Sequence, residues 1–343
     1  MIGRTETGAG RSYGGAVTDE APTPADDAVG GRFWWWVAGA VAVAAAIRLA
    51  YTAASNVPSE PGFLVTFDPI YYHRQALAVA DGHGFVAPYR SDGAPSADHP
   101  PLLVMVLAAA SRLGVRSFEA HRVITALIGA GVVPLLAVLA RRLAGARAGI
   151  VAAVLAAVAP LLWVNDGQLM PEPLFAVALA GALVLAHRLW DGVDRPLVEA
   201  AALGAVIALA ALTRGEGLML LGFTVVPLVL WAPSLDGWRP RLATAAVAAV
   251  TCAVVLSPWL AHNAARFEER VLLSSSADSA FAGANCDLTY GGEGLGGWTT
   301  ECFAGHSNQE LEESVFSRRI RADAVAHVRD HLDDLPRVVA ARV

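Results

Sequence analysis

The sequence predicts an all-α polytopic membrane protein: a bundle of about seven transmembrane helices with two long external loops. Of its 343 residues, 55% are hydrophobic and only 16% are charged, whereas soluble proteins average about 25% charged residues. The mean hydropathy is +0.48. The apolar residues are mainly Ala, Val and Leu, in runs long enough to cross a bilayer as helices, and the alternation typical of barrel strands is absent. The net charge of −6 argues against a nucleic-acid partner bound through a basic surface.

The chain opens with a polar tail and a first membrane span. Residues 1–31 are rich in Gly, Thr, Ala, Pro and Asp, which predicts a disordered cytoplasmic tail. The first span is expected over residues 33–51, with Arg48 close enough to its far end to snorkel to the headgroups. It opens the predicted transmembrane module, residues 32–260. The other expected spans lie near residues 121–139, 150–164, 172–189, 197–212, 218–231 and 242–260.

Arginines in the short connections set the predicted orientation. They occur in three connections, which we place in the cytoplasm by the positive-inside rule: Arg141, Arg142 and Arg147; Arg188 and Arg195; Arg239 and Arg241. Both long polar segments, 52–120 and 261–330, are then external. This topology requires the short apolar run 101–113 not to cross, and its 13 residues have the length of an interfacial or re-entrant helix.

With this topology, ionisable residues gather at the external side of the membrane. They come from four separate connections: Asp68, Arg74 and His99, then Asp166 and Glu172, then Arg214 and Glu216, and finally Asn263 and Arg266. Loops carry polar residues in any protein, Glu172 suits an ordinary helix N-terminus, Asp68 could simply cap a helix, and Arg214 could be a snorkelling residue. The coincidence across four connections favours a functional site.

The order of several short motifs resembles a known family. They are Asp68-Pro-Ile-Tyr-Tyr72, Asp81-Gly-His-Gly-Phe85, Asp98-His-Pro-Pro-Leu102, Pro171-Glu-Pro-Leu174, Thr213-Arg-Gly-Glu-Gly217 and Ser257-Pro-Trp259. This set resembles GT-C glycosyltransferases of the family 39 type, relatives of protein O-mannosyltransferases and lipid A aminoarabinose transferases. The resemblance covers roughly residues 33–330.

The resemblance implies a multi-pass plasma-membrane enzyme with an extracytoplasmic active face. It would transfer a sugar from a polyprenyl-phosphate carrier in the lipid bilayer to a polysaccharide, lipid or protein acceptor. By position, Asp68 matches the general base, His99 matches the contact to the carrier phosphate, and Glu172 matches a second acid. Pro69 stands where mannosyltransferases have another acid, which weakens any transfer of acceptor class.

These residue types also fit the chemistry of an inverting transfer. A carboxylate takes the proton of the acceptor hydroxyl, and cationic groups such as Arg214, His99 or Arg74 would stabilise the leaving phosphate. Tyr71 and Tyr72 could stack on a sugar face. Asp166 and Glu216 complete the expected substrate and carrier site. No acid cluster with metal-ligand spacing was recognised, so dependence on a divalent metal stays open, and no other cofactor is expected.

Two cysteines bracket a polar stretch of the second external loop. A disulfide between Cys286 and Cys302 would contribute about 3 kcal/mol by loop entropy, and two free thiols are the alternative. Cys252 lies in an apolar run and suits inert packing. Residues 331–343 are interpreted as the start of a truncated C-terminal portion, because family members carry further spans. The alternative functions are a transporter or flippase of lipid-linked sugars and a non-catalytic membrane fragment.

Overall fold

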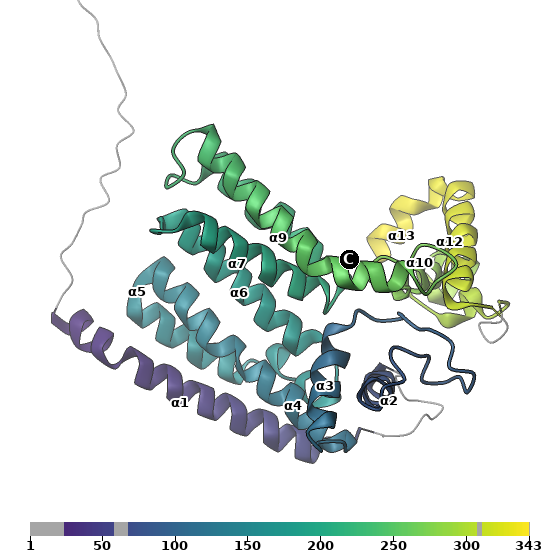
Figure 1. The fold of residues 1–343 in the computed structure, drawn as a ribbon, viewed down its shortest axis with the longest axis horizontal. Helices are drawn as coiled ribbons and strands as arrows, with labels where there is room; N and C mark the ends of the chain where they lie inside the picture. Colours follow the sequence, from purple (N-terminus) through teal and green to yellow (C-terminus); the bar gives the residue numbers. More distant parts are fainter. Residues whose placement is uncertain (1–23, 58–67, 307–310, 343) are drawn as a thin grey trace, which may run out of the picture.

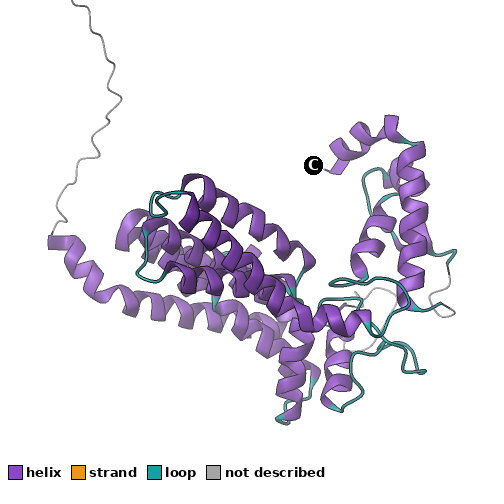
Figure 2. Ribbon diagram, turned by 45° about the horizontal axis from the view of Figure 1, so that its top comes forward, coloured by secondary structure: helices purple, strands orange, loops and turns teal. Residues whose placement is uncertain are grey.

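The computed structural model describes residues 24–57, 68–306 and 311–342. Within these ranges the chain is helical, and the only extended pairing is an isolated antiparallel bridge between Val86 and Pro95 (Figure 2). The predicted all-α polytopic fold is therefore confirmed.

A bundle of long apolar helices forms the larger part of the molecule. In Figure 1 the helices α1, α5, α6, α7 and α9 run side by side, and α2, α3 and α10 to α13 lie near one end of them. The bundle helices are α1 (Pro24–Ala54), α4 (Phe118–Ala130), α5 (Val132–Val158), α6 (Glu172–Asp191), α7 (Pro196–Ala211), α8 (Val226–Trp231) and α9 (Trp238–Ala264). Short turns join them: η1 (Pro160–Leu162), η2 (Asp166–Gln168), η3 (Gly215–Leu218) and the π-helical η4 (Leu221–Val225).

Four stretches are long and apolar enough to cross a membrane: Gly31–Ala54, Phe118–Val158, Glu172–Asp191 and Trp238–Ala264. The 41-residue stretch folds back on itself. Gly145 has φ of 85°, and a Cβ added to Gly149 would lie 2.7 Å from the carbonyl oxygen of Ala137, so the two limbs pack against each other. With the shorter apolar helices Pro196–Ala211 and Gly215–Trp231, these segments correspond to the seven predicted spans, and the number of crossings stays a prediction.

Two of the arginine-bearing connections lie close together. Arg142 pairs with Asp191 across two connections at 3.1 Å, and the Arg141 guanidinium lies 4.4 Å from the centre of the Phe33 ring. This arrangement agrees with the predicted grouping of these arginines on one side of the membrane.

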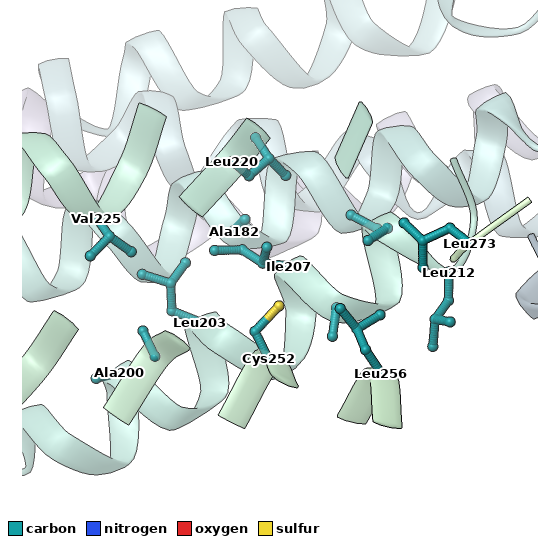
Figure 3. Close-up of a cluster of buried hydrophobic side chains, with 14 of the residues drawn as sticks. Ala182, Ala200, Leu203, Ile207, Leu212, Leu220, Val225, Cys252, Leu256 and Leu273 are labelled. Carbon is teal, nitrogen blue, oxygen red and sulfur yellow. The ribbon is translucent and has the colours of Figure 1, made fainter. Parts of the chain in front are cut away.

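Small residues let α7 and α9 approach closely. A Cβ on Gly204 would lie 2.1 Å from the carbonyl oxygen of Ala248, so only glycine fits there. Leu203, Ile207 and Cys252 fill the adjoining core (Figure 3). Close backbone approach through small residues is how helices associate in lipid. Cys252 is buried packing, as the sequence predicted.

The first long polar segment, 52–120, contributes two helices, α2 (Asp68–Ala80) and α3 (Leu102–Arg112). The eleven residues of α3 span about 16 Å, roughly half of a ~30 Å hydrocarbon core. The backbone N–H of Leu102 donates to the carbonyl of Leu212 at 2.9 Å, which fixes the start of α3 against the end of α7. Its length fits the predicted helix that does not cross.

The second long polar segment, 261–330, and the residues after it form a small helical unit rather than an extended loop. It contains α10 (Ser276–Ala284), α11 (Asp287–Tyr290), η5 (Gly292–Gly294), η6 (Thr300–Phe303), α12 (Glu313–Asp330), η7 (Leu332–Asp334) and α13 (Leu335–Arg342). Cys286 and Cys302 form a disulfide with their Cα atoms 5.6 Å apart. Helix α13 packs back on this unit, where Arg337 donates to the carbonyl oxygen of Tyr290 at 2.8 Å.

Two expectations for the N-terminal region change. Helix α1 begins at Pro24, inside the predicted tail 1–31, and residues 1–23 of that tail lie outside the described residues. Arg48 does not snorkel: it is 0% exposed and pairs with Asp166. A buried guanidinium is strongly destabilising unless it pairs with an opposite charge. Asp166, at the start of η2, provides that charge.

Candidate functional site

The centre of the candidate site is a contact between Asp68 and His99. Asp68 begins α2, and His99 precedes the proline pair that leads into α3. Nε2 of His99 lies 3.6 Å from Oδ1 of Asp68 and 3.6 Å from Oδ2 of Asp98. The Tyr72 ring stacks on the His99 ring at 4.9 Å, and Tyr71 meets it edge-on at 4.9 Å. The tyrosines therefore hold the imidazole between two carboxylates.

This arrangement sets the charge of each group. The polar contact with His99 lowers the pKa of Asp68 against the effect of burial, and the positive charges of His99 and Arg214 add to it. Burial alone would lower the pKa of His99, but the contact with Asp68 and the charge of Asp98 outweigh it and raise that pKa. Burial raises the pKa of Asp98. The centre thus favours an ionised Asp68 beside a protonated His99.

Arg214 joins the centre from the connection between α7 and η3. It forms ion pairs with Glu172, in the first turn of α6, and with Glu216 at 3.2 Å. Burial would lower the pKa of Arg214, but the hydrogen bond to Glu216 and the charge of Glu172 raise it. The charge of Arg214 also acts on Asp68 and Tyr72. Three predicted residues from two further connections therefore lie near the Asp68–His99 contact.

A cavity of about 740 Å³ opens beside this centre. Part of its lining comes from the first long polar segment and includes Asp68, Tyr71, Tyr89 and His99. The other part comes from the second long polar segment. It carries aromatic rings, hydroxyls and one acid: Trp298, Phe303, Phe316, Ser275, Ser276, Ser279, Thr300, Ser317 and Glu313. The two long polar segments enclose one space, large enough for a drug-sized ligand.

Glu313 is the main residue that sequence reasoning missed. Its Oε1 accepts hydrogen bonds from the backbone N–H of Ala97 at 2.8 Å and from the Ser275 hydroxyl at 2.7 Å, so it links the two cavity walls. Burial, followed by the charge of Asp98, raises its pKa to about 7. Its position as the first residue of an amphipathic helix resembles ordinary capping, and the sequence offered no sign of its distant partners.

Asp166 does not belong to this cluster, contrary to the prediction. Its carboxylate pairs with Arg48 inside the bundle, where the side chains are 3% and 0% exposed. A Cβ on Gly129 would lie 2.0 Å from Oδ2 of Asp166, so α4 closes over the pair. Asp166 lies in the connection between α5 and α6, but its carboxylate points into the bundle, where it pairs with Arg48.

Arg74 occupies the edge of the site. Its guanidinium lies 5.9 Å from the centre of the Tyr89 ring, and Tyr89 lines the cavity. For a metal, the centre offers two carboxylates and one imidazole, but the one group of three close metal-ligating side chains among the described residues lies elsewhere, at Asp287, His327 and His331.

Comparison with known proteins gives one match. Residues 98–262 match the family model described as dolichyl-phosphate-mannose-protein mannosyltransferase. The match confirms the resemblance to GT-C glycosyltransferases over that span, which contains His99, Glu172, Arg214 and Glu216 and ends before the helical unit that starts at α10. No curated protein and no solved structure matches the chain.

Proposed function

We propose that this membrane glycosyltransferase of the GT-C type moves a sugar from a polyprenyl-phosphate carrier to an acceptor hydroxyl, with inversion and with Asp68 as general base. One observation carries the proposal: the Asp68 carboxylate lines a 740 Å³ cavity and lies next to the cationic pair His99 and Arg214. A base facing an acceptor space, with cations beside it, is what displacement of a phosphate requires.

Asp68 would act on the acceptor. Its lowered pKa keeps it ionised at neutral pH, so it can accept the hydroxyl proton as the acceptor oxygen attacks the anomeric carbon. The new bond forms on the face opposite the bond to the carrier phosphate, which breaks with its electrons going to the phosphate. A single displacement of this kind inverts the anomeric centre.

His99 and Arg214 would act on the carrier phosphate. A protonated imidazole and a guanidinium are charge-assisted donors to phosphate oxygens. Glu172 and Glu216 pair with Arg214 and would aim it while the phosphate is absent. Tyr71 and Tyr72 hold the His99 ring. A transporter reading is disfavoured, because such proteins place their charges near the membrane midplane and here the charges meet at one end of the bundle.

The acceptor would enter between the two external segments. Trp298 and Tyr89 offer flat apolar rings, and Ser275, Ser276 and Ser279 offer hydroxyls along the cavity. Rings with nearby hydroxyl groups suit a hydroxyl-bearing acceptor, such as a sugar or a hydroxyl side chain. The acceptor class, whether polysaccharide, lipid or protein, stays open.

The test is Asp68→Asn in membranes supplied with labelled polyprenyl-phosphate sugars. This change keeps the shape and removes the basicity, so transfer should fall by ~10²–10⁴ while carrier binding is retained. Asp81→Asn is the matched control: Asp81 lies just past the other end of α2 and pairs with Arg116 on the surface, so transfer should persist.

A separate measurement, of carrier binding, tests the proposed contacts of His99 and Arg214 with the carrier phosphate. His99→Ala and Arg214→Ala should weaken carrier binding, because their expected partner is the phosphate. If Asp68→Asn transfers sugar at the parental rate, the base is wrongly assigned, and Asp98 or Glu172 would take its place as the candidate.

A further inference from the structure

A group of three metal-ligating side chains lies in the second external unit, outside the glycosyl-transfer site. His327 and His331 are one helical turn apart at the end of α12, and their rings stack with centroids 4.2 Å apart. Asp287 reaches them from the start of α11. One ligand atom of each of the three lies within 4.8 Å of the others, and this is the one such group among the described residues.

A hydrogen bond orients the imidazole of His331. Nδ1 of His331 donates to the carbonyl oxygen of His327 at 2.9 Å, which leaves the lone pair on Nε2 available to a ligand. Such a bond to a main-chain carbonyl is the usual way in which a metal-ligating histidine is fixed. Nδ1 of His327 lies 3.5 Å from Oδ1 of Asp287.

The ring nitrogens of His327 make no hydrogen bond among the described residues. Its Nε2 is buried and has no hydrogen-bond partner among the described residues, and the contact from its Nδ1 to Asp287 is longer than a hydrogen bond. The Tyr290 ring packs edge-on against it at 4.6 Å. An imidazole with a buried, unpaired ring nitrogen is expected to gain from a stronger interaction.

We propose that Asp287, His327 and His331 bind one divalent cation of the zinc class. Two imidazoles and one carboxylate are a ligand set for Zn²⁺ and its neighbours, whereas Mg²⁺ and Ca²⁺ prefer oxygen ligands alone. Asp287 is 91% exposed, so solvent reaches the group and water can complete a tetrahedral shell. The three side chains are not among those that line the cavity of the glycosyl-transfer site.

The cation would join two parts of the cavity wall. Asp287 follows Cys286, and the disulfide-closed loop that starts there carries Trp298 and ends at Cys302. The histidines lie at the far end of α12, which begins at Glu313. Trp298 and Glu313 both line the cavity. Binding would therefore cross-link the loop to the helix and stiffen the cavity wall that they share.

The test uses the purified full chain in detergent, stripped of metal by a chelator and titrated with Zn²⁺ by calorimetry. We expect one Zn²⁺ per chain and a rise in the unfolding temperature. Asp287→Asn and His331→Gln should each weaken binding by about tenfold or more. His306→Gln is the control: it removes a histidine that pairs with Asp323 at 2.8 Å in the same unit and should leave the affinity unchanged.

A second measurement identifies the ligands. Cu²⁺ bound in place of Zn²⁺ should show coupling to two imidazole nitrogens by electron paramagnetic resonance, and to one in His331→Gln. The proposal is overturned by the absence of stoichiometric Zn²⁺ binding, by tighter binding of Mg²⁺ or Ca²⁺ than of Zn²⁺, or by parental affinity in Asp287→Asn. That last variant changes an exposed side chain, so it tests the site even if a histidine variant fails to fold.

Discussion

Replacing Glu313 with Gln should change how the stability of this protein depends on pH. Glu313 bridges the two external segments through Ala97 and Ser275, and burial raises its pKa to about 7 from an ordinary value of 4.5. Between these two values the folded chain holds a proton that the unfolded chain has lost. The stability that Glu313 contributes is therefore full below about pH 4.5 and is lost as the pH rises through about 7.

The size of this effect follows from the shift. One unit of pKa corresponds to about 1.36 kcal/mol, so a rise from 4.5 to about 7 corresponds to roughly 3 kcal/mol of stability lost across this pH range. Glu313→Gln keeps a carbonyl oxygen for both hydrogen bonds and cannot ionise. Relative to the parental chain, the variant should gain about that amount between pH 4.5 and pH 8.

Thermal unfolding of the full chain in detergent, repeated at several pH values, measures this difference. The parental protein should lose several degrees relative to Glu313→Gln as the pH rises. Glu301→Gln, which changes an exposed acid in the same unit, is the control and should follow the parental curve. Parallel curves for Glu313→Gln and the parental chain would show that Glu313 is not buried against Asp98, and the bridge between the segments would have to be abandoned.

Three further predictions concern packing, the disulfide and topology. Asp166→Ala should destabilise the chain by about 3–5 kcal/mol in thermal unfolding, because it leaves Arg48 buried without a counter-ion; loss of sugar transfer at parental stability would instead return Asp166 to the site. Replacing Cys286 and Cys302 with Ala should cost about 3 kcal/mol of stability, and alkylation of both thiols in the non-reduced parental protein would contradict the bond. Ser117→Cys should react with an impermeant reagent in intact cells, and protection until the membrane is permeabilised would overturn the external placement of α3.

The bundle could be predicted because its signals are local. Runs of Ala, Val and Leu of membrane-spanning length, and arginines in the short connections, depend only on neighbouring residues. The hairpin in α5 was recoverable because Arg141, Arg142 and Arg147 mark its turn. The start of α1 at Pro24 could not be predicted, because composition alone does not distinguish the polar first turn of a helix from a disordered tail.

The site was predicted in part, for a similar reason. Asp68, His99, Glu172 and Arg214 each stand next to a proline or glycine that begins or ends a helix, and a topology that puts them on one side is enough to bring them near. The side chains that each of these residues contacts directly could not be predicted in this way. Asp166 shows this: its connection was placed correctly, yet its side chain turns inward because Arg48, 118 residues earlier, is buried there.

The most distant contacts left no trace in sequence spacing. Glu313 and Ala97 are 216 residues apart, and the second external segment looks like a long polar loop until it folds into helices. The proposed metal site was not predicted from the sequence. His327 and His331 have the i, i+4 spacing of a shared helix face, but the third proposed ligand, Asp287, comes from another element.

The residues proposed to form the site lie partly inside and partly outside the span that matches the family. Residues 98–262 contain His99, Glu172 and Arg214, the groups proposed to hold the carrier phosphate. Asp68 precedes this span, and Trp298, Phe303 and Glu313, which form the opposite wall, follow it. A transferase of this kind must recognise a common donor group and a particular acceptor. The part of the cavity lining that is proposed to bind the acceptor therefore lies outside the matched span. Substitutions within residues 275–317 should alter the choice of acceptor and leave carrier binding in place. Substitutions of Arg214 should weaken carrier binding with any acceptor.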